Sequence, residues 1–279
     1  MRVALLGGSG LIGSALGNVL RARGDEVVVL SLREPEAAAL PAAECDAVIN
    51  LAGEPIAQRW NASIKARILK SRTETPRNFL KALSSLPRRC AAYVSASGID
   101  YYGPSLEATF DEESPPGRSP LAQVCVEWER EAHAAGTLGM RVACVRTGLV
   151  LGDGGLLAKV VPLFRAGLGG RIGDGKTWYS WIHITDVVGI YVLALDGVNG
   201  PLNAVAPNPV TNAEFTQTLA DVLHRPAALP TPSFAVRAML GEGASALLDR
   251  QRVLPKRVLQ LGYRFAFAEL GAALENLLE

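Results

Sequence analysis

The segment GGSGLIG at residues 7–13 constrains the fold more than any other part of this sequence. It directly follows an apolar run, RVALLG at 2–7, and opens a helical pattern at 11–24 that leads to a second apolar run, EVVVLS at 26–31. A glycine-rich turn between a strand and a helix, inside a unit of about 30 residues, is typical of a βαβ unit that binds a dinucleotide. The segment therefore predicts a parallel sheet with crossover helices.

The same segment supplies candidate contacts to a diphosphate. Gly7 and Gly10 allow a tight turn and a close approach of backbone amides to the ligand, and Gly13 permits close packing of the helix on the strand. Free amides at the start of a helix carry a partial positive charge that favours an anion. The predicted phosphate-binding residues are Gly7, Ser9, Gly10, Leu11, Ile12 and Gly13. A structural glycine turn with no ligand is the alternative interpretation.

Further apolar runs alternate with helical patterns along the chain. Strands are expected at 47–53, 91–97, 141–148 and 201–206, and helices at 65–85, 120–136 and 212–224. Right-handed crossovers arrange such strands as a doubly wound α/β sheet of the Rossmann type, whose carboxyl edge binds ligands. After about residue 150 the sequence is rich in glycine and proline loops. We therefore predict a dinucleotide-binding domain at 1–155 with a returning sheet segment at about 182–206, and a smaller C-terminal substrate lobe formed by 156–181 and 207–279.

Composition excludes several classes of protein. The net charge of the 279 residues is +1 and both signs are interspersed, so the basic surface of a nucleic-acid or anionic-membrane binder is not expected. No run approaches the roughly 18 apolar residues of a membrane span. The cysteines are too far apart for a zinc or redox motif, so we predict no metal site and free thiols in a reducing compartment. The N-terminus starts directly on a strand pattern, which favours a cytoplasmic protein.

The end of the second expected strand favours NADP over NAD. An NAD site normally places an acidic residue there to bind the ribose hydroxyl, whereas this strand ends in LSLRE, with Ser31 and Arg33 at the position. An arginine fork suits a 2′-phosphate. The alternative is that Arg33 is a solvated loop residue beside Glu34.

Three motifs point to a family. The spacing G-x-x-G-x-x-G, NLAG at 50–53 and WIHITDV at 181–187 resemble the extended, epimerase-like branch of the short-chain dehydrogenase/reductase (SDR) superfamily. The resemblance implies that Leu51, Ala52 and Gly53 support the adenine side of the cofactor. It also implies that Arg146 and Gly148, at the end of the strand at 141–148, line its carboxamide end.

The usual catalytic dyad of that superfamily is absent. Ser97 aligns with its catalytic serine, and Tyr101 and Tyr102 resemble its trailing Tyr-Gly, but Leu121 and Cys125 stand where Tyr-x-x-x-Lys is expected. Several further motifs are similar to the epimerase-family proteins of the atypical SDR group, which carry a C-terminal domain of unknown function. These are YYG at 101–103, EESPPG at 112–117, RTGLVLG at 146–152 and NAVAPNPVTNAEF at 203–215.

These observations lead to two functional hypotheses. The first is an NADP-dependent oxidoreductase or epimerase, hence an isomerase, that acts on a small carbonyl or sugar-derived substrate, with an anionic substrate as one option. Its candidate catalytic residues are Ser97, Tyr101 and Tyr102, because hydride transfer needs a proton donor near the substrate oxygen. The second is a non-catalytic NADP-binding sensor or scaffold that has lost the dyad. A homodimer is an option that the resemblance implies.

Two other residues have a more structural interpretation. Cys125 is interpreted as a small buried side chain, with a thiol acid or nucleophile as the alternative. His183 and Asp186 are interpreted as groups that lock the lobe onto the Rossmann domain, with a remote role of His183 as a proton donor as the alternative.

Overall fold

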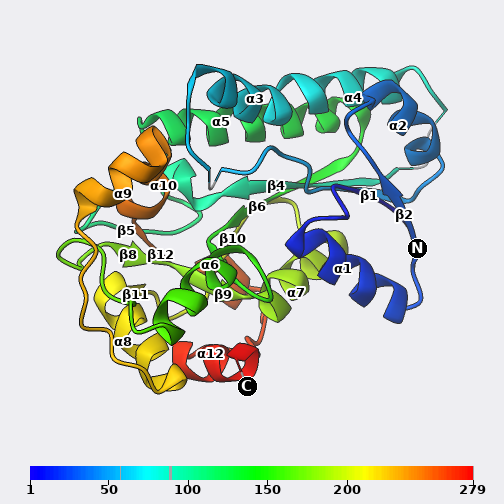
Figure 1. The fold of residues 1–279 in the computed structure, drawn as a ribbon. Helices are drawn as coiled ribbons and strands as arrows, with labels where there is room; N and C mark the ends of the chain where they lie inside the picture. Colours follow the sequence, from blue (N-terminus) through cyan, green and yellow to red (C-terminus); the bar gives the residue numbers. More distant parts are fainter. Residues whose placement is uncertain (57, 88–89, 279) are drawn as a thin grey trace.

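The computed structural model describes residues 1–56, 58–87 and 90–278. Its centre is a six-stranded parallel sheet in the order β10-β6-β4-β3-β1-β2, which confirms the predicted α/β fold (Figure 1). The strands are β1 (Arg2–Leu6), β2 (Glu26–Leu30), β3 (Ala47–Asn50), β4 (Ala92–Gly98), β6 (Arg141–Thr147) and β10 (Gly200–Ala204).

Helices cover both faces of the sheet, as expected for parallel strands buried on both sides. One face carries α2 (Pro35–Ala43), α3 (Ala62–Arg72), α4 (Glu74–Ser84) and α5 (Pro120–His133), and the other carries α1 (Leu11–Ala22) and α7 (Ile184–Leu195) (Figure 1). Alternate residues of β1 enter the two cores: Val3 and Leu5 pack with α1 and α7, and Ala4 and Leu6 pack with α2 and α4.

The strand order reverses beside β1, which pairs with β2 on one side and β3 on the other. The loops after β1 and β3 therefore leave the carboxyl edge of the sheet at this switch point, where ligands bind in open α/β sheets.

Two helical predictions need correction. The helix expected at 65–85 is two helices, α3 and α4, that meet at Thr73, whose φ of −117° and ψ of −69° interrupt the helical geometry. Asn61 caps α3 by accepting a hydrogen bond from the amide of Ile64. Helix α2 is not among the predicted elements, because its alanine-rich sequence with Pro41 inside it lacks an amphipathic pattern.

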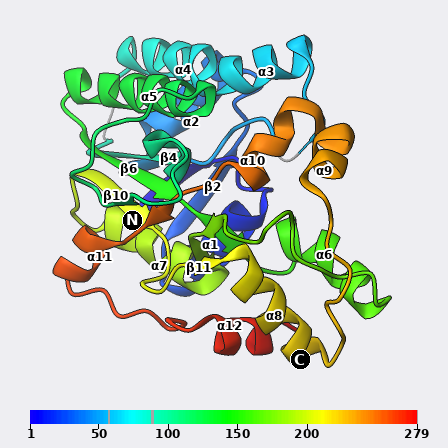
Figure 2. The same ribbon diagram turned by 90° about the vertical axis from the view of Figure 1, so that its left-hand side faces the viewer.

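The second half of the chain adds three two-stranded pairs and several helices beside the sheet. The pairs join β5 (Thr109–Phe110) with β12 (Arg252–Val253), β7 (Leu149–Leu151) with β9 (Trp181–His183), and β8 (Trp178–Tyr179) with β11 (Val210–Thr211). The helices are α6 (Gly155–Arg165), α8 (Asn212–Leu223), α9 (Ser233–Leu240), α10 (Ser245–Leu248), α11 (Lys256–Gln260) and α12 (Leu270–Leu278). Figure 2 shows α6, α8 and α12 on the side of the molecule away from α3 and α4.

Asp186 ties the C-terminal segment to α7. Its buried carboxylate accepts hydrogen bonds from the backbone amides of Ala266 (2.8 Å) and Phe267 (3.0 Å) and from the hydroxyl of Tyr263 (3.2 Å). The ring of His183 packs on that of Phe267, with 3.9 Å between the centroids. Both contacts hold the end of the chain against α7, as the locking interpretation expects.

Among the residues described, no helix combines the length and the hydropathy that a membrane crossing requires.

Candidate dinucleotide and substrate site

The loop after β1 has the backbone geometry that its glycines predict. Gly7 adopts a φ of +81°, and a Cβ on it would lie 2.8 Å from the amide nitrogen of Ala52. A Cβ on Gly13 would lie 2.4 Å from the carbonyl oxygen of Gly7. Side chains at these two positions would collide with backbone, so glycine is required for the loop to pack against the end of β3 and the start of α1.

Gly10 differs, because the space beside it is open. A Cβ there would have only the Gly7 oxygen nearby, at 3.7 Å, and both Ser9 and Gly10 are exposed. No side chain caps the start of α1, so the amides of Leu11 and Ile12 in its first turn have no intrahelical acceptor. An open cradle with free N–H groups at a helix N-terminus fits the pyrophosphate of a dinucleotide.

Ser31 and Arg33 lie in the exposed turn after β2, on the side of β1 opposite β3. The amide of Arg33 donates to the hydroxyl of Ser31 at 3.2 Å. Within the described ranges, the guanidinium of Arg33 has no ion-pair partner. Leu51 and Ala52 are half-buried and Gly53 is exposed, directly beyond β3.

Of the predicted catalytic residues, Ser97 and Tyr102 belong to one buried polar network at the ends of β4 and β6, and Tyr101 borders it. The Ser97 hydroxyl donates to Oε1 of Glu129 at 2.7 Å. The guanidinium of Arg146 donates to Glu129 through both Nε and Nη2, each at 2.8 Å, and to the Tyr102 hydroxyl through Nη1 at 2.9 Å. The Tyr102 hydroxyl in turn donates to Oδ1 of Asn203 at 2.7 Å.

The two tyrosines differ in their surroundings. Tyr102 is 3% exposed, and burial raises its pKa to about 12, although Arg146 beside it acts in the opposite direction. Tyr101 is half-buried, and the guanidinium carbon of Arg146 lies 3.5 Å from its ring centroid. In the part of the chain that the structure describes, the Tyr101 hydroxyl has no hydrogen-bond partner. Tyr101 is therefore the tyrosine whose hydroxyl is free to bind a substrate.

The other predicted residues at this edge are held by protein contacts. Each of the three guanidinium nitrogens of Arg146 donates a hydrogen bond as described above, so its side chain organises the network. A Cβ on Gly148 would lie 2.2 Å from the carbonyl oxygen of Ser180, so close packing against the β8–β9 turn requires glycine there. The contact of Arg146 and Gly148 with a cofactor stays a prediction.

The positions of the missing dyad are apolar and closed. Leu121 and Cys125 are 8% and 5% exposed on the inner face of α5. Burial is the main cause that raises the pKa of the Cys125 thiol far above its ordinary value, so the thiol is neutral. This agrees with the interpretation of Cys125 as a small buried side chain.

Two members of the network were not among the predicted site residues. Glu129 follows Cys125 by one helical turn, so the inward stripe of α5 was a signal for it. Asn203 sits in β10 and reaches Tyr102 across the sheet edge, and no local pattern identifies such a partner.

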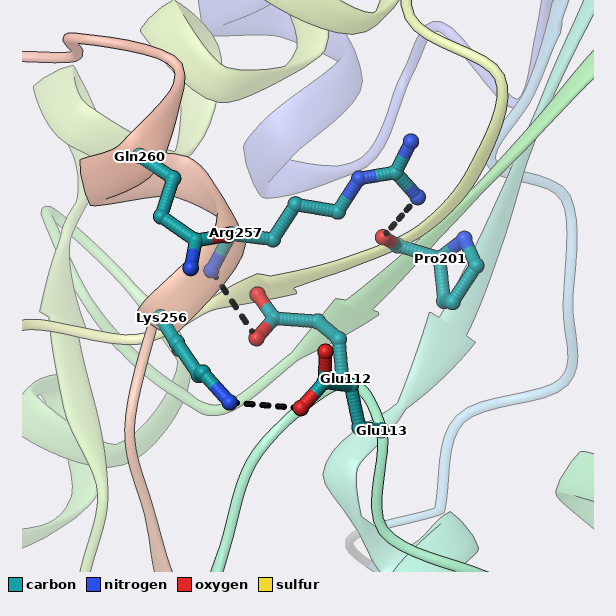
Figure 3. A pocket seen from close by; sticks show the side chains of 6 residues that line it. All are labelled: Glu112, Glu113, Pro201, Lys256, Arg257 and Gln260. Carbon is teal, nitrogen blue, oxygen red and sulfur yellow. Dashed lines mark hydrogen bonds and ion pairs between the residues drawn. The ribbon is translucent and has the colours of Figure 1, made fainter.

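A cavity of 260 Å³ lies at the edge of β10, lined by Glu112, Glu113, Pro201, Lys256, Arg257 and Gln260 (Figure 3). The Glu112 carboxylate accepts from the backbone amides of Asn203 (2.9 Å) and Arg257 (3.1 Å). Lys256 pairs with Glu113 at 2.5 Å, and Arg257 donates to the carbonyl of Pro201 at 3.1 Å. The charged groups here are all used in joining α11 to the sheet. Across the described ranges, no cluster of side chains could hold a metal ion.

Comparisons with known proteins agree with this architecture. The model of the NAD-dependent epimerase/dehydratase family matches residues 3–204, and that of a domain of unknown function, DUF1731, matches residues 231–277. The chain is 43% identical to the human epimerase family protein SDR39U1 over 99% of both chains, and 35% identical to the Bacillus subtilis epimerase family protein YfhF over 100% of this chain and 98% of that one.

Solved structures give the same result. The crystal structure of human SDR39U1 (isoform 2) with NADPH superposes with a TM-score of 0.93 at 42% identity, over 99% of both chains. The UDP-glucose 4-epimerase of Thermus thermophilus in complex with NAD gives a TM-score of 0.79 at 22% identity, over 99% of this chain and 97% of that one, and so shares the fold.

Proposed function

The chain belongs to the NAD-dependent epimerase/dehydratase family, and on that basis we propose that it binds NADPH and acts as an oxidoreductase or epimerase on a small carbonyl or sugar-derived substrate. The observation that carries the proposal is the open cradle at Gly10, at the switch point of the sheet and the N-terminus of α1. A diphosphate placed there interacts favourably with both the free amides and the helix dipole.

The preference for NADPH rests on Arg33. This exposed residue forms no ion pair within the described ranges and follows β2, where the adenosine ribose of a dinucleotide lies in this type of sheet. The similarity to a protein whose structure was solved with NADPH supports the same choice.

The chemical step is assigned to the network at the ends of β4 and β6. When bound, the nicotinamide supplies or accepts the hydride. The free hydroxyl of Tyr101 gives a proton to the substrate oxygen or takes one from it, and the guanidinium over its ring stabilises the phenolate that results. Ser97, Glu129, Arg146 and Tyr102 keep this arrangement rigid. In the same proposal, the lobe formed by 156–181 and 207–279 covers the substrate side.

One observation favours the second candidate, a non-catalytic NADPH sensor. The Tyr102 hydroxyl is fully engaged, and the dyad positions Leu121 and Cys125 carry no acid or base. In a sensor, Tyr101 only packs against the cofactor.

An assay of binding and turnover separates the two candidates. NADPH affinity is measured by fluorescence titration, and oxidation of NADPH is followed across a panel of aldehydes, ketones and oxidised sugars. The proposal expects turnover that falls at least about a hundredfold in Tyr101→Phe with an unchanged NADPH affinity. In the matched variant Tyr102→Phe, the lost hydrogen bond to Asn203 lowers stability more than turnover. Tight NADPH binding without turnover of any compound supports the sensor, and failure to bind NADPH contradicts both candidates.

A further inference from the structure

Arg72, the last residue of α3, is a buried cation that pairs with no carboxylate among the described residues. It is 5% exposed, and its Nη1 donates to the backbone oxygens of Glu54 (3.0 Å) and Ile68 (3.2 Å). Its Nε is shielded from solvent and has no acceptor among the described residues. A desolvated guanidinium is costly unless an acceptor binds its free donors.

Two other arginines on this side of the sheet show the carboxylate contact that Arg72 lacks among the described residues. Arg146 uses its Nε and Nη2 to hold the two oxygens of Glu129, each at 2.8 Å. Arg77 uses the same two atoms to hold Glu131, at 2.9 and 2.7 Å. In Arg72 this Nε–Nη2 edge contacts no acceptor within the described chain. The edge has the geometry that binds carboxylate or phosphate in a two-point contact.

The surroundings fix the plane of the guanidinium. The ring of Trp128 lies 4.7 Å from the Arg72 guanidinium carbon and fixes its plane. On the other side is Gly53, where a Cβ would lie 3.1 Å from Nη2 and 3.2 Å from Cζ. A Cβ at Gly53 would press against the guanidinium, so glycine lets the loop after β3 lie close to it.

This position is close to the predicted phosphate loop. Ala52, next to Gly53, contacts Gly7 of the phosphate loop. Beyond Arg72, towards β4, lie Cys125 and Asp100, each with an atom 3.5 Å from where a Cβ of Gly98 would be. A dinucleotide whose pyrophosphate lies at β1 extends its nicotinamide half over β3 and β4. A substrate beside the nicotinamide is therefore close to Arg72.

We infer that the Nε–Nη2 edge of Arg72 binds a carboxylate or phosphate group of the substrate. The substrate class is then a small carbonyl compound that carries an oxyanion, which deepens the proposed function and rests on it for the placement of the reacting carbonyl. Arg72 supplies, from α3, a fixed cation next to Cys125, the position on α5 where a lysine is missing.

The nearby carboxylates do not occupy the Nε–Nη2 edge of Arg72. Glu54 is directed to Arg67 (3.3 Å) and Gln58 (3.2 Å). Asp100 is half-buried. Burial is the main influence on the pKa of Arg72 and lowers it, whereas the charge of Asp100 raises it by a smaller amount. No ion pair joins Asp100 to Arg72 within 4.0 Å. Because Glu54 is engaged elsewhere, Asp100 is the carboxylate among the described residues nearby that is placed to compete for the guanidinium.

The test is calorimetric titration of the NADPH-loaded protein with two probes, inorganic phosphate and succinate. The inference expects binding of at least one probe, weakened about tenfold or more in Arg72→Met. Arg77→Met is the matched control, since the same edge of Arg77 is already occupied by Glu131, and it leaves probe binding unchanged. Asp100→Asn removes the competitor and strengthens binding. Arg72→Lys keeps the positive charge but cannot make the two-point contact. It serves as a second variant in case the methionine variant misfolds, and it is expected to bind the probes more weakly than the parent protein.

Several results would overturn the inference. One is that neither probe binds the parent protein, and another is that Arg72→Met binds them equally well. A third is that Arg72→Met weakens NADPH itself as much as the probes, because the oxyanion would then belong to the dinucleotide. Failure of the proposed function has a different signature: titration with NADPH then shows no binding, while the protein without nucleotide still binds phosphate or succinate through Arg72.

Discussion

Glu129 and Arg146 form a two-point ion pair in the interior, with Nε and Nη2 of the arginine each 2.8 Å from a carboxylate oxygen. Their side chains are 8% and 5% exposed. Ser97 donates to the same carboxylate, and Tyr102 accepts from the same guanidinium. One ion pair between α5 and β6 therefore orients the two predicted catalytic side chains that surround it.

Glu129→Gln is expected to lower the free energy of unfolding by about 3–5 kcal/mol, because it leaves the Arg146 charge buried and unpaired. Urea unfolding measures the change. Glu127→Gln on the same helix removes an exposed pair with Arg130 and is expected to cost less than about 1 kcal/mol. Equal effects of the two substitutions would mean that the buried pair is unimportant for stability.

Gly10→Ala is expected to weaken NADPH binding without loss of stability. Its φ of −76° suits alanine, and the added methyl group meets no protein atom closer than 3.7 Å. The methyl group instead takes space assigned to the pyrophosphate, at a cost of about 1–3 kcal/mol, or roughly 5- to 150-fold in affinity. Gly136→Ala, at an exposed position with open space, is the control. Unchanged affinity in Gly10→Ala would place the ligand elsewhere.

Arg33→Ala is expected to reduce the affinity for NADPH and leave that for NADH unchanged. A charge-assisted contact to a 2′-phosphate contributes about 1.5–3 kcal/mol, or roughly 10- to 150-fold in the dissociation constant. Titration of both nucleotides measures the ratio, and Arg21→Ala, on the exposed side of α1, is the matched control. If the affinities for both nucleotides fall equally, Arg33 does not contact the 2′-phosphate.

His183 predicts a stability loss in mild acid. Burial lowers its pKa below the ordinary value of about 6.5, although the charges of Asp186 and Asp153 act in the opposite direction. The unfolded chain therefore takes up a proton before the folded one does. Stability that is present above about pH 6.5 is lost as the pH falls through the folded-state pKa.

His183→Asn tests this prediction. Asparagine keeps an acceptor for the amide of Thr185, which now bonds to Nδ1 at 3.1 Å, but it does not titrate. Thermal melts between about pH 7 and pH 5 should then show a smaller decrease in melting temperature than the parent protein or His133→Asn, a change at an exposed helix position. An identical decrease in all three proteins would exclude His183 as the cause.

The sequence predicts the sheet because its signals are local. The strand patterns, the glycine loop and the helix at 11–24 each lie within one continuous segment, and the structure has them at these places. The break at Thr73 was missed because the apolar pattern runs on through it, and α2 was missed because alanine-rich sequence carries no periodicity.

The site is predictable only in part, for the same reason. Ser97, Tyr101 and Tyr102 are adjacent in sequence at a strand end, so their grouping follows from a single motif. Arg72 of α3 reaches Trp128 of α5, and Asn203 reaches Tyr102 from the far strand of the sheet. Contacts of this kind form only when distant segments pack together, and no local spacing of residues in a single sequence indicates them.

Glu112 has a consequence for how the protein can be divided. Its two carboxylate oxygens serve the backbone of β10 and the first residues of α11, while Ser180 accepts from the amide of Val253. Removal of residues 231–277 would leave one Glu112 oxygen, the Ser180 hydroxyl and the Asp186 carboxylate without the amides that now donate to them. The two segments that match separate family models are therefore expected to unfold as a single cooperative unit. If either segment is exchanged for that of a relative, the residues that contact it must be exchanged as well.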